Sequence, residues 1–421
     1  MTSIAPIQHL TTRFKSYLLL AMIGVAGETI AGDWPQILGP NRDGQAIGET
    51  ISAWTKSPAI RWRFPCGAGY AGVAVASEKV LLWHRLDDQE VLDCLSVKDG
   101  RRLWRTTFPA IYRGGVDADR GPRSVPVIQG DQGFVYGAAG DLHAVALESG
   151  TKAWSRELRI DHEAEDGYFG AGSSPIVVGD MIITAIGGRN GAGLVAVNTS
   201  DGKTRWTAVN EQVSYASPVI MHVGNETRVI AMMSLKTVMI DPVTGKVISQ
   251  FDFGRRGPTV NAATPLVDGT QLFVTSSYNV GCRKLDMASE PPTDLWKNRD
   301  GISSQYSTPV RVGDWLYAIN GREDVGDAGL MCARWTDGNV AWGRSNFGTA
   351  HLIAAGDRVL AQVTNGRLEL FAAEPKSFRQ LAVADLPEGT YRSLPALADG
   401  FLYCRRTTSA TEGELLAVEL E

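Results

Sequence analysis

The segment SSPIVVGDMIITAIGGRNGAGLVAVNTSDGKTRW, residues 173–206, contains one complete copy of the repeat that determines the fold. Its Ser-Pro step leads into two short apolar runs, 176–178 and 181–186, which the turn-forming pair Gly179-Asp180 joins. A Gly-rich link leads to a third run, and the turn at Asp201-Gly202 leads to a fourth that ends at Trp206. Apolar runs of this length between turn residues predict four antiparallel strands.

The same spacing recurs along the chain. A Gly precedes a Trp by four residues at Gly100/Trp104, Gly150/Trp154, Gly202/Trp206 and Gly338/Trp342. The opening step with Pro recurs at positions 124–126, 174–175, 217–218, 264–265, 308–309 and 394–395. Six copies are clear. Two more are degenerate: 73–104 lacks the Ser-Pro opening, and 350–383 ends without a Trp.

Eight copies of a four-stranded unit predict an all-β fold, an eight-bladed β-propeller of four-stranded antiparallel blades. The repeat length follows from the ends of successive copies, which lie about 42 to 52 residues apart at Trp62, Trp104, Trp154, Trp206, Phe251, Trp296 and Trp342. The last copy supplies only three strands, at 395–397, 401–405 and 415–420, and a lone Trp strand stands at 60–64. We therefore expect the ring to close by pairing of the N- and C-terminal strands.

The N-terminus carries an export signal. Arg13 and Lys15 precede an 11-residue apolar core at 17–27 and the small residues near 29–31, which predicts a signal peptide over residues 1–31. The alternative is an uncleaved anchor, but the core is shorter than the ~20 residues of a spanning helix. No Cys follows the core to accept a lipid. We expect an exported protein, periplasmic or extracellular.

Two further units follow the signal. Residues 32–59 are rich in turn formers and contain Trp34 and Trp54, so we expect an extended arm laid over the ring, with an unstructured linker as the alternative. Residues 60–421 form the propeller. The composition, 44% hydrophobic and 21% charged with a net charge of −5, is that of a soluble globular protein and gives no indication of nucleic-acid binding. The mature chain contains no apolar run long enough to span a bilayer.

Five cysteines in an exported protein raise the question of disulfides. The repeat places Cys94, Cys282 and Cys332 at one third-strand register, where other copies carry Ala144 and Ala196. We interpret all three as small apolar side chains packed between blades. Cys66 and Cys404 both lie near the closing blade, and whether they pair stays open.

The connections between strands fall into two classes. Turns between first and second strands and between third and fourth strands are short pairs such as Gly130-Asp131 and Asp337-Gly338. The other connections emerge on the opposite side, and the long ones occupy residues 106–123, 156–172, 253–263 and 320–329. We call the two sides the tight-turn face and the long-loop face. Binding residues concentrate on long loops of this kind, so the long-loop face is the expected functional surface.

Six polar residues stand just before the first strands of six copies, where a radial ring would gather them around the mouth of its central channel. These mouth residues, the candidate ligand-binding set, are Arg123, Tyr215, Asn261, Tyr306, His351 and Arg392. They suit an anionic or polar ligand; the alternative is that they satisfy one another around water. The acidic run 161–166 could hold a divalent cation, but a solvated loop is the preferred interpretation, and no metal is expected. No catalytic residue is identified.

The eight Trp-ended repeats with Ser-Pro openings resemble the pyrroloquinoline quinone (PQQ)-like propeller family, which includes the quinoprotein alcohol dehydrogenases and the barrel-assembly lipoprotein of bacterial outer membranes. The arm, with Trp34-Pro35-Gln36 and then Gly39 to Gly44, is similar to that of a large set of uncharacterised secreted bacterial members. The resemblance implies the fold but no catalytic residue. The chain has neither the adjacent Cys pair of the dehydrogenases nor a Cys-x-x-Cys-His haem motif.

Three functional hypotheses remain. The leading one is a secreted, non-enzymatic binding or scaffold protein that takes a protein or a small polar ligand on its long-loop face and needs no cofactor. The alternative is a quinoprotein dehydrogenase that depends on PQQ and calcium. The third is a hydrolase or lyase that uses the acidic, Arg and His groups of the mouth.

Overall fold

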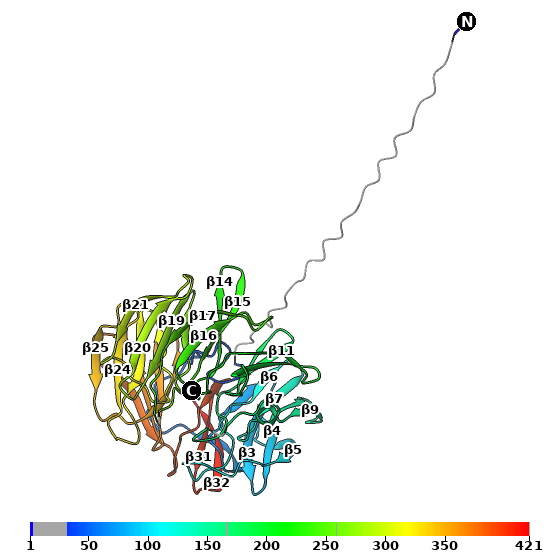
Figure 1. The fold of residues 1–421 in the computed structure, drawn as a ribbon. Helices are drawn as coiled ribbons and strands as arrows, with labels where there is room; N and C mark the ends of the chain where they lie inside the picture. The colour runs from blue at the N-terminus through cyan, green and yellow to red at the C-terminus, as the bar shows by residue number, and fades with distance from the viewer. Residues whose placement is uncertain (3–31, 166, 258, 421) are drawn as a thin grey trace.

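The computed structural model describes residues 1–2, 32–165, 167–257 and 259–420. These residues form eight four-stranded antiparallel sheets arranged as the blades of a ring (Figure 1), so the predicted eight-bladed propeller is confirmed. Apart from residues 1 and 2, the expected signal peptide lies outside the described residues. Within the described part of the chain, no helix is long and apolar enough to cross a membrane.

Blades 1 to 7 each consist of four consecutive strands that pair in chain order. Blades 1 to 4 contain β2 (Val73–Ala76), β3 (Lys79–Leu86), β4 (Gln89–Ser96) and β5 (Arg102–Pro109); β6 (Val127–Gln129), β7 (Gln132–Tyr136), β8 (Leu142–Ala146) and β9 (Lys152–Arg156); β10 (Ile176–Val178), β11 (Met181–Ala185), β12 (Leu194–Asn198) and β13 (Thr204–Ala208); and β14 (Val219–Val223), β15 (Glu226–Met232), β16 (Lys236–Ile240) and β17 (Val247–Asp252). A single turn of helix, α1 (Leu158–Asp161), stands between blades 2 and 3.

The second half of the ring repeats this pattern. Blades 5 to 7 contain β18 (Leu266–Asp268), β19 (Gln271–Ser276), β20 (Gly281–Asp286) and β21 (Thr293–Asn298); β22 (Val310–Val312), β23 (Trp315–Asn320), β24 (Gly329–Arg334) and β25 (Val340–Arg344); and β26 (Ala350–Ala355), β27 (Arg358–Val363), β28 (Arg367–Ala372) and β29 (Gln380–Asp385). Blade 8 combines both ends of the chain and contains β30 (Ala396–Ala398), β31 (Phe401–Thr407), β32 (Glu412–Glu419) and β1 (Ile60–Gly67).

The tryptophans of the repeat connect each blade to the next. Each donates its indole N–H to a backbone carbonyl of the following blade at 2.8 to 3.0 Å, and the donors are Trp62, Trp104, Trp154, Trp206, Trp296 and Trp342. Five of these rings also lie over the Gly in the turn between the third and fourth strands of the next blade. A Cβ on Gly150, for example, would lie 2.4 Å from the ring of Trp104. Within one blade, the recurring Gly therefore contacts the preceding blade, and the Trp four residues later contacts the following blade.

Blades 4 and 7 lack this contact. The strand position that carries Trp elsewhere is Ser249 in blade 4 and Ala382 in blade 7, as their partners Met239 and Leu370 indicate. The sequence analysis took Phe251 as the equivalent of the tryptophan in blade 4, and this assignment is wrong by two residues. The bulge between the third and fourth strands places the tryptophan position four residues after the turn Gly, which is Ser249 in this blade.

The glycine under each ring provides a direct test of this contact. Gly150 (φ +70°) and Gly130 (φ +59°) both require left-handed backbone, but nothing lies within 4 Å of a Cβ added at Gly130. Both Ala variants therefore carry similar backbone strain, and only Gly150→Ala forces Trp104 to move. We expect Gly150→Ala to lower the free energy of unfolding by about 1–3 kcal/mol more than Gly130→Ala, measured by denaturant titration. Equal losses would show that the ring does not depend on this contact.

The arm lies across the tight-turn face and enters the ring. Trp34 is buried and exchanges two backbone hydrogen bonds with Val75 of blade 1. Farther along, Ala46 donates to Ala354 of blade 7, and both carboxylate oxygens of Glu49 accept N–H groups from the turn at Asp399 in blade 8. These contacts of the arm are thus with the consecutive blades 7, 8 and 1, at their first strands or at the turn that follows.

Arg42 is the most deeply inserted charge of this arm. It is 2% exposed, and its guanidinium donates to the backbone carbonyls of Ser174 and Pro175 in blade 3 and of Pro218 in blade 4. The Ser side chains of the same openings link neighbouring blades, since Ser174 N–H donates to Ser217 Oγ at 2.9 Å. The Ser-Pro step therefore supplies two kinds of hydrogen-bond acceptor: a Ser hydroxyl for the neighbouring blade and backbone carbonyls for Arg42 of the arm.

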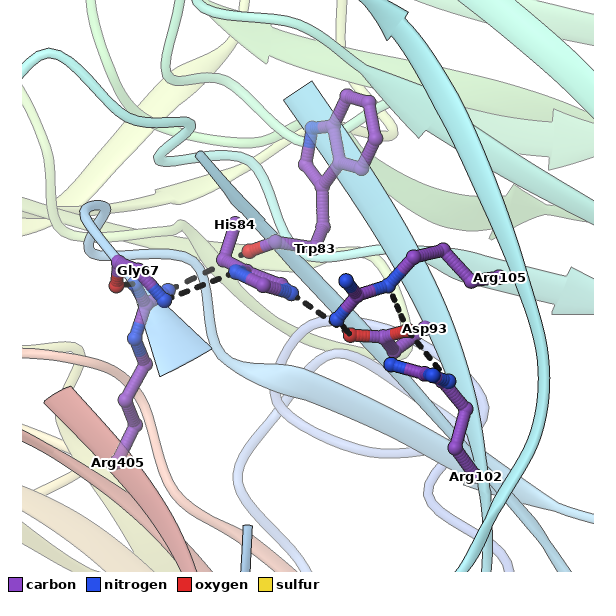
Figure 2. A network of polar contacts seen from close by, with 7 residues as sticks. All are labelled: Gly67, Trp83, His84, Asp93, Arg102, Arg105 and Arg405. Atoms are coloured by element: carbon purple, nitrogen blue, oxygen red, sulfur yellow. Dashed lines mark hydrogen bonds and ion pairs between the residues drawn. The ribbon is translucent and has the colours of Figure 1, made fainter. Parts of the chain in front are cut away.

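Blade 8 closes the ring as expected. β1 pairs with β32 from Ile60 to Gly67, which is longer than the predicted 60–64, and Figure 1 shows the red β31 and β32 beside the blue β3 and β4. A buried polar network joins this blade to blade 1 (Figure 2). Arg405 of β31 donates to the Gly67 carbonyl at 2.6 Å, and Gly67 N–H donates to Nδ1 of His84 at 2.9 Å.

Asp93 anchors the other end of this network. His84 Nε2–H donates to it at 2.9 Å, and Arg105 donates two hydrogen bonds at 2.7 Å. Burial alone would raise the pKa of Asp93, but the hydrogen bonds from Arg105 and His84 hold it below its usual value. The carboxylate is thus kept charged in a site with no exposure to solvent.

Removing that carboxylate tests the joint between the chain ends. Asp93→Ala leaves the guanidinium of Arg105 and the buried imidazole of His84 without their acceptor, so we expect a loss of about 3–5 kcal/mol in unfolding free energy. Asp99→Ala, in an exposed turn of the same blade, is the control and should change stability by less than about 1 kcal/mol. Similar midpoints of thermal unfolding for the two variants would contradict this role.

All five cysteines are buried and free. Cys66 in β1 lies opposite Gly413, and Cys404 in β31 lies opposite Leu416. The two therefore stand on either side of β32, about 9–10 Å apart across the sheet alone, which is beyond the reach of a disulfide. Cys94 and Cys332 each pair with the fourth-strand tryptophan of their blade, as predicted. In blade 5 the residue that pairs with the tryptophan is Lys284, so the placement of Cys282 at this position is wrong by two residues.

Candidate functional site

A cavity of about 750 Å³ opens among the connections of the long-loop face, above blades 2 to 4. Six chain segments line it, and every one is a connection on this face rather than a strand. The segments are 114–116, 165–168 without the undescribed position 166, 187–189, 210–215, Ser234 and 257–260 without position 258. The loop asymmetry seen in the sequence therefore corresponds to a real hollow.

Two tyrosines from neighbouring loops contribute to this cavity. Tyr168 is 48% exposed at its edge, and its carbonyl accepts a hydrogen bond from Val116 N–H at 3.1 Å. Tyr215 is held more rigidly, because its hydroxyl accepts the Phe169 N–H at 2.8 Å. Burial raises the pKa of Tyr215 to about 12. Its phenol is thus a neutral hydrogen-bonding group at any physiological pH.

Tyr215 is the one mouth residue that lines this cavity. Arg123 and Arg392 lie instead on Tyr70, with each guanidinium 5.6 Å from the centroid of that ring. Arg392 also forms ion pairs with Glu323 at 2.8 Å and Asp117 at 3.5 Å. These contacts join the segments just before the first strands of blades 1, 2 and 8 to a loop of blade 6.

Tyr306 and His351 complete this axial cluster. Their rings are 5.7 Å apart, and His351 Nε2–H donates to the Arg392 carbonyl at 2.8 Å. Burial lowers the pKa of His351, so the imidazole is neutral. Burial, together with the Glu323 carboxylate, raises the pKa of Tyr306. His351 lies inside β26, one residue beyond the strand start, rather than before the strand as the sequence suggested.

Asn261 has a different environment. It is 4% exposed, and its side-chain nitrogen donates to the carbonyls of Met233 and Ser234 at 2.9 and 3.0 Å. None of the six mouth residues is exposed, since Asn261 and His351 are buried and the other four are half-buried. The structure thus brings Arg123, Arg392, Tyr306 and His351 into a network of mutual contacts. Their role in ligand binding stays a prediction.

A second hollow of about 360 Å³ lies beside the first and is lined by Tyr112, Asp141 and α1 among others. Behind its wall, Oε2 of Glu90 and Oδ1 of Asp141 face one small space, because a Cβ on Gly137 would lie 2.3 and 2.5 Å from them. Neither oxygen has a hydrogen-bond partner among the described residues. Asp141 is fixed by His143 Nε2 at 2.5 Å. The sequence analysis missed this pair, which no motif marks.

The Glu90 carboxyl of this buried pair has a raised pKa. Burial, reinforced by the Asp141 carboxylate, raises the pKa of Glu90 to about 8, so Glu90 carries a proton at neutral pH. The pKa of Glu90 is higher in the folded state than in the unfolded state, so the protonated carboxyl contributes stability that is fully present below about pH 4.5. This contribution is lost as the pH rises through 8.

Substitution of Glu90 tests this linkage. Glu90→Gln keeps a donor toward Asp141 and an acceptor for Ala138 N–H, but it cannot ionise. We expect the wild-type unfolding free energy to fall between pH 5 and pH 8.5, with a slope of at most about 1.4 kcal/mol per pH unit, relative to the variant. Glu163→Gln, an exposed residue of the same hollow, is the control. Parallel stability profiles for the wild type and Glu90→Gln would refute the raised pKa of Glu90.

Two described carboxylates of the acidic loop pair with arginines. Asp161 pairs with Arg156 at 2.7 Å, and Glu165 pairs with Arg189 at 3.3 Å. Among the residues that the structure describes, no three His, Cys, Asp or Glu side chains gather closely enough to hold a metal ion. Toward the axis, Arg392 is already paired with carboxylates, and Arg123 donates to the Gly121 and Asp119 carbonyls. These two arginines are therefore already engaged and are not free to bind a quinone carboxylate.

Comparisons with known proteins place the chain in a family. The family model described as outer membrane protein assembly factor BamB matches residues 47–214 and 87–344. No curated protein matches the chain.

Solved structures agree in fold at low identity. BamB from Moraxella catarrhalis is 13% identical with a TM-score of 0.60, over 89% of this chain and 98% of that one. Quinohemoprotein alcohol dehydrogenase from Comamonas testosteroni is 13% identical with a TM-score of 0.67, over 92% and 80%. A europium-containing methanol dehydrogenase is 11% identical with a TM-score of 0.69, over 93% and 99%.

Proposed function

Because the chain belongs to the PQQ-like β-propeller family described by the outer membrane protein assembly factor BamB, we propose that it is an exported, non-enzymatic binding or scaffold protein. Its binding surface is the long-loop face. The observation that supports this most directly is the 750 Å³ cavity, which loops between blades 1 and 5 build together. Such a hollow has the size of a small-ligand site.

The contrast between the cavity and the axis supports binding rather than catalysis. At the axis, Arg392 is neutralised by Glu323 and Asp117, and His351 donates to a backbone carbonyl. These groups hold the loops of several blades in place. The residues available to a ligand are those of the off-axis cavity, where Tyr168 stands half exposed.

The second candidate is the PQQ- and calcium-dependent dehydrogenase, which the fold of the alcohol and methanol dehydrogenases favours. PQQ and CaCl₂ added to the purified protein distinguish the two. We expect no quinone absorbance to be retained after desalting and no reduction of an artificial electron acceptor with primary alcohols. Retained quinone with alcohol-dependent dye reduction would replace the binding proposal.

Binding on the long-loop face is tested by thermal shift against a panel of small polar ligands. Ligands that stabilise the wild type should fail to stabilise Tyr168→Ala and should be recovered unchanged by mass spectrometry. Val243→Ala is the matched control, because Val243 is 71% exposed in a turn of the opposite face, and it should respond as the wild type does. Hits that persist in Tyr168→Ala but disappear in Val243→Ala would move the site to the tight-turn face.

A further inference from the structure

We infer that the 750 Å³ cavity takes a neutral polyhydroxylated ligand, an oligosaccharide of several sugar units. This inference rests on the proposed binding function of the long-loop face and specifies the ligand class. The inference rests on three observations: the described lining has no unpaired cation, it is dense in groups that both donate and accept hydrogen bonds, and a half-exposed aromatic ring stands at its edge.

The described charges of the lining leave little to attract an anion. The charged side chains that line the cavity are Glu165, Arg189 and Glu211. Arg189 and Glu165 already pair at 3.3 Å, with both side chains exposed to solvent. A phosphate or carboxylate ligand needs an available cation, and the cation of this lining already faces a carboxylate. A neutral ligand avoids this cost.

The polar groups of the lining match hydroxyls. Amide and hydroxyl side chains both donate and accept, as a sugar hydroxyl does. The lining contains five of them, Asn210, Gln212, Ser214, Ser234 and Thr259. Six glycines add accessible backbone without side chains in the way, at positions 114, 115, 167, 187, 188 and 257.

The aromatic edge supplies the apolar half of sugar recognition. Tyr168 combines a flat apolar face with a polar tip, and the 74% exposed Val116 stands next to it through the 3.1 Å backbone hydrogen bond. The C–H face of a pyranose can cover such a ring while its hydroxyls reach the amides. Tyr215 lies deeper and presents a neutral phenol.

A peptide is a poorer fit. Peptides bind by adding a strand to a sheet edge or by placing anchor side chains in apolar pockets. Loops, not strand edges, line this cavity, and the large apolar side chains among its described residues are Val116, Val213, Val260 and the two tyrosines.

The test uses the full mature chain and defined probes: maltohexaose, cellohexaose, chitohexaose and xylohexaose by calorimetry, with the corresponding polysaccharides in affinity gels. We expect at least one to bind. Tyr168→Ala should weaken that binding by roughly tenfold or more. Ile160→Ala, which is 65% exposed on the same face but lines the neighbouring hollow, should stay within about twofold of the wild type.

The outcomes separate the two proposals. Absence of binding to every glycan, with Tyr168-dependent binding of a peptide or an anion, overturns the ligand class and leaves the binding function intact. Glycan binding that Tyr168→Ala does not affect overturns the site. Cleavage of a bound glycan, detected by chromatography, supports the ligand class but overturns the non-enzymatic function. No binding by any probe in either assay overturns the inference.

Discussion

The contact between a fourth-strand tryptophan and the turn glycine of the next blade is the interaction on which the ring depends. A four-stranded sheet cannot bury its two faces alone, so each blade needs a specific way to sit on its neighbour. The indole covers a glycine that has no Cβ to displace it and donates to a carbonyl beside that glycine, as Trp104 does with Gly150 and Leu147. Packing and hydrogen bonding thus fix the same joint.

Where the tryptophan is missing, other contacts serve. Between blades 4 and 5, Arg283 places its guanidinium 4.9 Å from the ring centroid of Phe251, in a position that the repeat alone does not specify. Between blades 8 and 1, where Trp62 does make the tryptophan contact, the network of Arg405, His84 and Asp93 adds a second, buried polar link (Figure 2). The arm adds a further constraint from the tight-turn face through Arg42.

These constraints leave the long-loop face free to vary. Its connections lie outside the paired strands, so they can form hollows while the blades stay intact. At the bases of these loops, the ion pair of Arg392 with Glu323 and the hydrogen bond from Ala138 N–H to Glu90 hold the chain in place. The cavity at Tyr168 is one part of this face that is open to a ligand.

The sequence by itself determined the fold class, the number of blades and the closure of the ring, because turn pairs, apolar runs and Gly-Trp spacing are local patterns that repeat. It also identified the face with the long loops. Only the tertiary structure decided how loop residues meet. Arg392 and Glu323 are 69 positions apart and form an ion pair, while Tyr168 and Val116 line a cavity that no spacing indicates. The register of Cys282 and Lys284 was likewise decided by strand pairing. Strand patterns are local and periodic, whereas side chains on irregular loops find partners only once the ring has closed.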